Sequence, residues 1–126
     1  MGIVVTLQPQ ERLLHDGEVI ASIYRNLGTA AADQMVSRAL GELSLALASL
    51  AGRIRLHDLA SAERQLHKLR SMASNLGLTS LADAAADARC CLQRGDGTAF
   101  AAIWARILRI AGRALNAQSD FADQSI

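Results

Sequence analysis

The chain has 126 residues, the size of a single domain that can bury a hydrophobic core. Thirteen Lys and Arg residues nearly balance twelve Asp and Glu residues, so the net charge of +1 argues against a nucleic-acid-binding surface. Hydrophobic residues make up 51% of the chain but aromatic residues only 3%, which favours closely packed helices over a β-sheet.

The first half of the chain predicts a short arm and two helices. Residues 1–16 have no clear pattern and are expected to form a poorly defined N-terminal arm. Residues 17–27 form a short amphipathic helix that ends at Gly28, and Thr29 is the expected N-cap of the next helix. In that second helix, hydrophobic residues recur at steps of three and four, the period of one helix face. These residues are Val36, Leu40, Leu43, Leu47, Leu50 and Ile54.

The second half predicts three further helices. A turn near His57 precedes Asp58, which we expect to cap a helix that ends at Gly77. Thr79 or Ser80 then caps a fourth helix, and the turn at residues 94–97 leads into the last one. Residues 118–126 are polar and are expected to form a C-terminal tail. The predicted buried positions are Leu59, Ala62, Leu66, Leu69, Ala73, Leu76, Leu81, Ala85, Ala88, Leu92, Phe100, Ile103, Ile107, Ile110 and Ala114.

Four long amphipathic segments with short connections predict an all-α fold, an antiparallel up-down four-helix bundle over residues 17–117. The short helix at residues 17–27 would cap one end of this bundle. No apolar run reaches the ~18–20 residues that span a bilayer. The first residues also lack the basic segment of a signal peptide, so we expect a cytoplasmic protein without membrane contact.

A histidine on the third helix is the main candidate for chemistry. Residues three, four and seven positions apart share a helix face, so Arg70, Ser71 and Ser74 lie on the same side as His67. The two small serines leave the imidazole ring accessible. Arg70 can contact an anion near the ring, and this setting suits a histidine that holds a phosphoryl group.

The run from His67 to Gly77 resembles the signature of histidine phosphotransfer (HPt) domains, the phosphorelay proteins of two-component signalling. Arg70 occupies a position where that family usually has Lys, and Ser71 a position where it usually has Gly. The resemblance implies structural roles for Leu69 and Gly77. The positions that match the family signature are His67, Leu69, Ala73, Leu76, Gly77 and Leu81.

The resemblance also implies a function. His67 would accept a phosphoryl group, through Nε2, from the aspartate of a response-regulator receiver domain and pass it to another receiver. Arg70, Lys68, Ser71 and Ser74 would contact the phosphate or the partner. The expected partners are receiver domains and a hybrid histidine kinase. No metal or other cofactor is expected in the chain itself, because the receiver would supply Mg²⁺, and we expect a monomer.

Neighbouring side chains complete this expectation. Gln65 and Arg89 would border the site, from the same helix and a neighbouring one. In the alternative in which Lys68 and Arg70 are ordinary surface residues, Glu63 would form ion pairs along its own helix, with His67 four residues away and Arg70 seven residues away. Cys90 and Cys91 predict buried or half-buried thiols on the flanks of a helix, and no disulfide framework.

Two other interpretations stay open. In the first, the chain is a helical adaptor, or pseudo-carrier, that binds receivers or another partner without being phosphorylated; the departures at Arg70 and Ser71 leave this class open. Alternatively His57, followed by Asp58, resembles the histidine box of dimeric histidine kinases and predicts a dimer formed through a helical hairpin. His15 has no supporting neighbours and is expected to lie on the surface.

Overall fold

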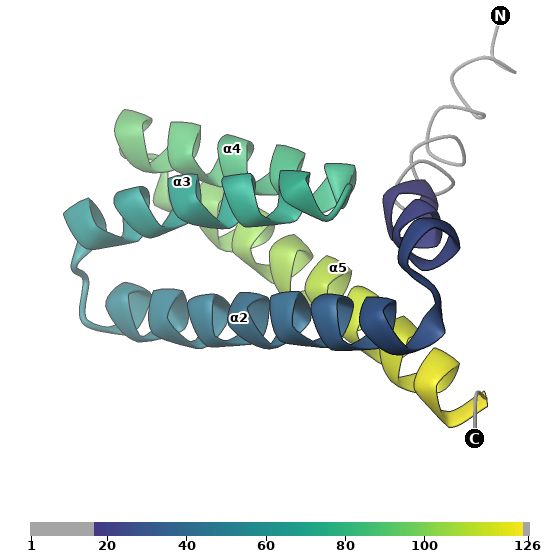
Figure 1. Ribbon diagram of the computed structural model, residues 1–126. Helices are drawn as coiled ribbons and strands as arrows, with labels where there is room; N and C mark the ends of the chain where they lie inside the picture. The colour runs from purple at the N-terminus through teal and green to yellow at the C-terminus, as the bar shows by residue number, and fades with distance from the viewer. Residues whose placement is uncertain (1–16, 125–126) are drawn as a thin grey trace, which may run out of the picture.

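Four long helices joined by short turns form the body of the protein. The computed structural model describes residues 17–124, and side chains as far as residue 116. Residues 17–27 are helical and are followed by α2 (Thr29–Arg55), α3 (Leu59–Asn75), α4 (Thr79–Arg94) and α5 (Gly97–Gln124). No strand occurs within residues 17–124. The predicted all-α antiparallel bundle is therefore confirmed (Figure 1).

The order of packing places α3 and α4 at the centre of the arrangement. Helix α3 packs against both α2 and α4, and α4 also packs against α5. Figure 1 shows α2, α3 and α4 side by side, with α5 inclined across them, and the helical segment 17–27 at the end where α2 begins. That short helix is tied to α2 by a hydrogen bond from the Tyr24 hydroxyl to the Asp33 carboxylate. It therefore covers one end of the bundle, as predicted.

The hydrophobic core follows the predicted helix faces closely. Full burial of one Leu or Ile side chain stabilises a fold by about 1.5–3 kcal/mol, so the buried residues on these helix faces supply most of the favourable free energy of folding. Leu59 is an exception at 49% exposure, because it is the first residue of α3. Five further predicted positions are only partly buried, namely Ile54, Leu92, Ile103, Ile110 and Ala114. The predicted positions that are buried are Val36, Leu40, Leu43, Leu47, Leu50, Ala62, Leu66, Leu69, Ala73, Leu76, Leu81, Ala85, Ala88, Phe100 and Ile107.

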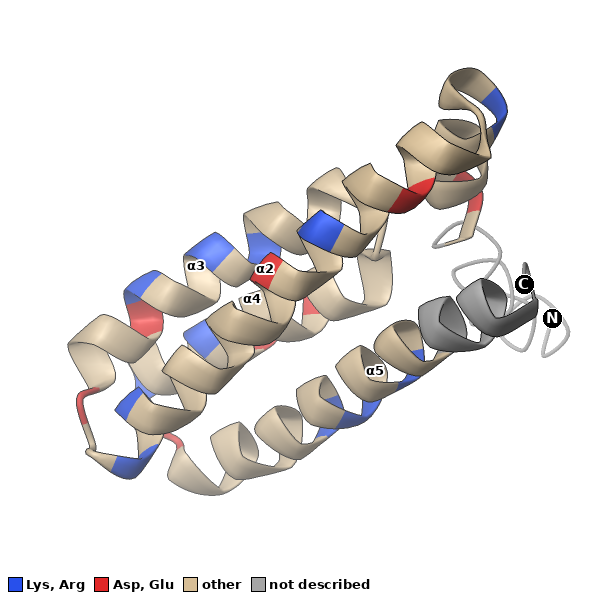
Figure 2. Cartoon of the chain, turned by 60° about the horizontal axis from the view of Figure 1, so that its bottom comes forward, with Lys and Arg blue, Asp and Glu red and all other residues tan. Residues whose placement is uncertain are grey.

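Charged side chains stay outside this core. Among the described residues, no polar or charged residue falls in the buried class. Figure 2 shows the Lys, Arg, Asp and Glu positions spread along the helices, with a run of basic positions on α5. The cost of burying an unpaired charge explains why these positions avoid the helix faces that meet in the core.

Three of the helices end with the same hydrogen-bonded turn. At the end of α3, the Leu78 amide donates to the Ala73 carbonyl at 2.8 Å and the Gly77 amide to the Ser74 carbonyl at 2.9 Å. This is the Schellman motif, which needs a left-handed residue after the helix. Gly77 has φ +72°, and the equivalent residues after α4 and α2 are Gly95 with φ +71° and His57 with φ +56°.

Helix starts agree less well with the sequence analysis. The Asp58 carboxylate caps α3 as predicted, accepting from the Ser61 amide at 3.3 Å. Hydrogen bonding to Ser61 lowers the pKa of this carboxyl. Since the folded state favours the charged form, the cap stabilises the fold above the ordinary Asp pKa and is lost as the pH falls through the lowered value. The caps predicted at Thr29 and at Thr79 or Ser80 were wrong.

The reason for those two errors is the shortness of the turns before the helices. Thr29 and Thr79 are already the first helical residues of α2 and α4. The N-cap positions are Gly28 and Leu78, and neither forms a side-chain cap hydrogen bond. The Thr79 hydroxyl instead donates to the Gly77 carbonyl at 3.5 Å.

The ends of the predicted domain are only partly described. The predicted N-terminal arm, residues 1–16 with His15, lies outside the described residues. Helix α5 continues to Gln124, so the polar segment that begins at residue 118 extends the helix as far as residue 124, and no Gly or Pro occurs in residues 118–124. The domain boundaries at residues 17 and 117 stay predictions.

Gly77 generates a stability prediction with a matched control. A Cβ added there would overlap with Val19 Cγ2, whereas a Cβ at Gly95 would meet no atom within 4 Å. Both sites have positive φ, which costs an Ala residue about 1 kcal/mol. We therefore expect Gly95→Ala to lower the free energy of unfolding by about 1 kcal/mol and Gly77→Ala by about 2–3 kcal/mol, measured by urea denaturation. Equal losses of unfolding free energy in the two variants would show that Val19 of helix 17–27 does not restrict the space beside Gly77.

Candidate functional site

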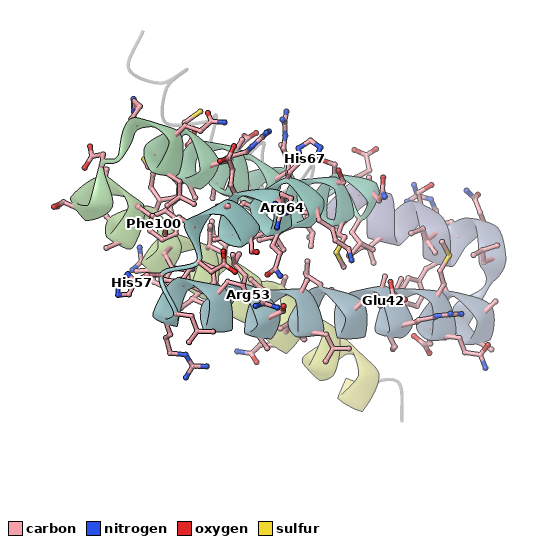
Figure 3. The ribbon with its side chains drawn as sticks, turned by 90° about the vertical axis from the view of Figure 1, so that its left-hand side faces the viewer. Glu42, Arg53, His57, Arg64, His67 and Phe100 are labelled. Atoms are coloured by element: carbon pink, nitrogen blue, oxygen red, sulfur yellow. The ribbon has the colours of Figure 1, made fainter. Side chains whose placement is uncertain are left out.

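His67 lies on the outer flank of α3, near the middle of the helix. Its neighbours Leu66 and Leu69 are 0% and 1% exposed, whereas His67 itself is exposed. Successive residues of a helix are rotated by about 100°, so the burial of Leu66 turns the imidazole away from the core. Figure 3 shows His67 on the outside of the bundle, well away from His57 at its end.

A small pocket lies beside the imidazole, between α3 and α4. Its volume is about 110 Å³. It is lined by small side chains of α4, Ala85 and Ala86, and by the buried Leu66 of α3. The residues that line it are Leu66, His67, Arg70, Ala85, Ala86, Arg89, Cys90 and Gln93.

Four polar side chains connect the two helices at this point. Arg89 Nη1 lies 3.4 Å from His67 Nδ1, and Arg89 Nε lies 3.4 Å from Glu63 Oε1. Gln93 Nε2 donates to the same Glu63 oxygen at 2.8 Å. Glu63 is one helical turn before His67, so this network places the guanidinium of Arg89 beside the imidazole ring.

The predicted contact residues Arg70, Ser71 and Ser74 are all exposed. Arg70 lines the same pocket as His67, so the structure brings these two side chains together. The Ser71 hydroxyl donates to the His67 backbone carbonyl at 3.4 Å, which folds this side chain back against its own helix. The small side chains on the C-terminal side of His67 therefore leave the imidazole ring accessible.

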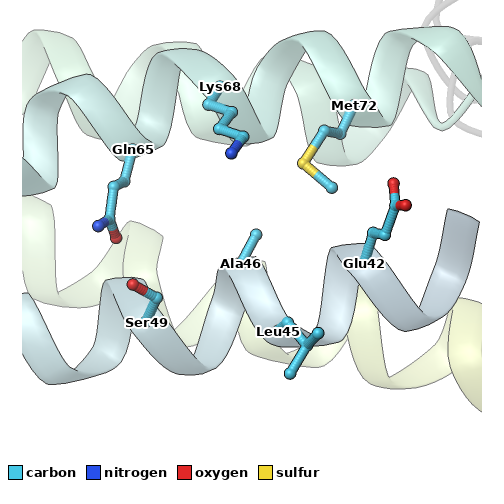
Figure 4. Close-up of a pocket in the computed structure, with 7 residues that line it drawn as sticks. All are labelled: Glu42, Leu45, Ala46, Ser49, Gln65, Lys68 and Met72. Atoms are coloured by element: carbon cyan, nitrogen blue, oxygen red, sulfur yellow. The ribbon is translucent and has the colours of Figure 1, made fainter.

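Lys68 lies on a different side of α3. It lines a groove of about 410 Å³ between α2 and α3, together with Gln65 and Met72 (Figure 4). The Gln65 Oε1 atom is buried there and has no hydrogen-bond partner among the described residues. The structure thus places the predicted contact residue Lys68 and the border residue Gln65 toward α2, and Arg89 toward His67.

Several features of the site were not predicted. Glu63 was expected to pair with His67 and Arg70 along α3, but its ion pair is with Arg89 of α4. The participation of Gln93 was missed, although it follows Arg89 by one turn and so shares its face of α4. Cys91 is buried as expected, whereas Cys90 is exposed and lines the pocket, which corrects the prediction for that thiol.

His57 occupies a structural position. It lies in the turn after α2, with φ +56°, where its amide donates to the Ile54 carbonyl at 3.1 Å. Because His57 lies beyond the end of α2, it does not share a helix face with small polar residues as His67 does. The surroundings therefore distinguish His57 from His67.

The described residues form neither a metal-ion cluster nor a membrane-spanning helix. Within residues 17–124, no group of three or more His, Cys, Asp and Glu side chains is placed to hold a metal ion. None of the helices in that range has the length and apolar character needed to cross a bilayer.

Comparison with known proteins identifies the class of this fold and site. The profile of the Hpt domain matches residues 34–118, which is more than half of the chain. The protein therefore belongs to the Hpt domain family, whose members act as phosphotransfer carriers in phosphorelays and interact with receiver domains and histidine kinases. No curated protein and no solved structure gave a significant match.

The ion pair between Glu63 and Arg89 generates a prediction about stability. Its side chains are 33% and 39% exposed, so solvent screens most of the attraction. A double-mutant cycle with Glu63→Gln and Arg89→Met should give a coupling energy of about 0.2–1 kcal/mol in urea denaturation. A coupling above about 2 kcal/mol would mean that the pair is desolvated and holds α3 and α4 together.

Proposed function

We propose that the protein is a histidine phosphotransfer carrier in which His67 is the phosphoacceptor. In this proposal it accepts a phosphoryl group from the aspartate of a receiver domain and passes it to a second receiver. Membership of the Hpt domain family supports the general role. The observation that supports the assignment to His67 is its exposed ring, at mid-helix, beside the guanidinium groups of Arg70 and Arg89.

The transfer step needs little from the carrier. The lone pair of an unprotonated ring nitrogen attacks the phosphorus of the phospho-aspartate, and an N–P bond forms as the P–O bond breaks. The aspartate leaves as a carboxylate with the bonding electrons, and the ring proton stays on the other nitrogen. Reversal of these steps delivers the group to the next receiver. Since phosphoryl transfer depends on positioning and charge stabilisation, one nucleophile and neighbouring cations suffice.

The surface around His67 suits docking of a partner. Ser71 and Ser74 are small and exposed on the same face, so a receiver can bring its active site close to the ring. Arg70 offers two parallel N–H groups to the phosphoryl oxygens. We propose that receiver domains and a hybrid histidine kinase are the partners, that the carrier acts as a monomer, and that it acts in the cytoplasm.

The first functional prediction separates the two described histidines. Incubation with a phosphorylated cognate receiver should label the wild-type protein with phosphate that is stable in base and labile in acid. His67→Gln should abolish this label because it removes the nucleophile, whereas His57→Gln should retain it. Circular dichroism of both variants provides the control for folding.

Two results would count against this assignment. Label that survives in His67→Gln and disappears in His57→Gln would transfer the role to the turn histidine. A protein that binds receivers but takes up no phosphate from any of a panel of phosphorylated receiver domains would be an adaptor.

The second functional prediction concerns the positions that depart from the family signature. Arg70→Ala should slow single-turnover transfer by about ten- to a hundredfold, equivalent to roughly 1–3 kcal/mol of charge stabilisation. Arg38→Ala is a matched control, because Arg38 lies on α2 with its side chain 83% exposed. Ser71→Leu should block docking and cut transfer sharply, whereas Ser71→Gly should leave it intact or faster. Wild-type rates in both Arg70→Ala and Ser71→Leu would show that receivers dock elsewhere.

A further inference from the structure

The contact between Arg89 and His67 defines where the ring proton lies. A guanidinium group has five N–H donors and no acceptor, and it stays charged at any ordinary pH. Arg89 Nη1 is 3.4 Å from His67 Nδ1, so in this contact Nδ1 must be the acceptor. A neutral imidazole with its lone pair at Nδ1 has its proton on Nε2.

In this arrangement neither ring nitrogen has a free lone pair. Nε2 bears the proton and has no lone pair for attack. Nδ1 has the lone pair, but that lone pair is directed at the guanidinium. Attack through Nε2 requires the proton to move to Nδ1, where it would face a second donor. Attack through either nitrogen therefore requires Arg89 to leave the ring first.

We propose that Arg89, anchored by Glu63, is a positioning residue that restrains His67 until a phosphoryl donor arrives. The inference rests on the proposed function of His67 as phosphoacceptor and adds a regulatory role for the α4 side of the pocket. Glu63 is held in turn by Gln93, whose amide donates to the same oxygen at 2.8 Å. The restraint therefore involves both helices, because Arg89 and Gln93 come from α4 while the carboxylate that anchors Arg89 comes from α3.

The incoming phosphoryl group can itself release the restraint. Hydrogen bonds between a guanidinium and a phosphoryl oxygen are about twice as strong as those to a neutral acceptor. Arg89 binds Glu63 through Nε and contacts His67 through Nη1, so the terminal nitrogens can turn to the phosphoryl group while the ion pair persists. The same guanidinium would then stabilise the phosphohistidine that forms.

A neutral electrophile tests the restraint without involving phosphate. Diethyl pyrocarbonate modifies the free lone pair of imidazole and, being uncharged, does not attract Arg89. The reaction of every variant is run at the same pH, about 8, which lies above the pKa of about 6.5 of a free histidine side chain. The rate at His67 is measured by peptide mass spectrometry relative to His57, which serves as the reference in the same chain.

Arg89→Met is the informative variant, because methionine keeps a long side chain over the ring but has no donor. We expect the ratio of His67 to His57 modification to rise by about three- to tenfold, the change expected for loss of one hydrogen bond. Glu63→Gln should give a smaller rise, since it removes only the charge that anchors Arg89. Arg94→Met, on the same helix but outside the pocket, should leave the ratio unchanged.

The outcomes separate this proposal from the proposed function. A ratio in Arg89→Met equal to that of the wild type, with circular dichroism showing a folded protein, would overturn the restraint. A raised ratio in a protein that takes up no phosphate would support the restraint and refute the carrier role. In a protein that is phosphorylated on His67, a phosphohistidine half-life unchanged by Arg89→Met would overturn the transfer of Arg89 from ring to phosphoryl group.

Discussion

The burial of one face of α3 between α2 and α4 is the constraint on which the site depends. Leu66 and Leu69 are almost completely excluded from solvent, and this fixes the rotation of the helix about its axis. Because each residue advances by about 100°, the same rotation directs His67 outward toward α4 and Lys68 toward α2. The exposure of the candidate nucleophile is thus a consequence of core packing, and the residues around it are those that the packed helices present.

Helix α4 supplies the remaining residues of the site. Its core face consists largely of alanine, with Ala84, Ala85 and Ala88 buried, so α3 and α4 can approach closely. That approach lets Arg89 reach both Glu63 and His67 across the interface. The ion pair is too exposed to add much stability, and its consequence is the placement of a positive charge next to the imidazole.

The two described histidines show how the same side chain takes different roles in one bundle. His57 ends α2 in a left-handed conformation that glycine supplies at the ends of α3 and α4. Its position is explained by backbone geometry alone. His67 has an ordinary helical backbone, and its position is explained by its flank of α3 and by the cations that meet there. A short distance along the chain therefore separates a turn residue from a candidate phosphoacceptor.

Local periodicity by itself determined the helices, their buried faces, the turn at His57, the stop at Gly77 and the flank position of His67. These features depend on steps of three and four residues and on backbone preferences that act within a few positions. Only the tertiary structure decided the ion-pair partner of Glu63, the side of α3 on which Lys68 lies and the exposure of Cys90. It also decided that the N-caps of α2 and α4 have no side-chain cap hydrogen bond. Each depends on which helix packs alongside, on its rotation, or on how tightly the chain turns between helices. Such relations join residues far apart in sequence, as the contact between Glu63 and Arg89 does, and no local pattern contains them.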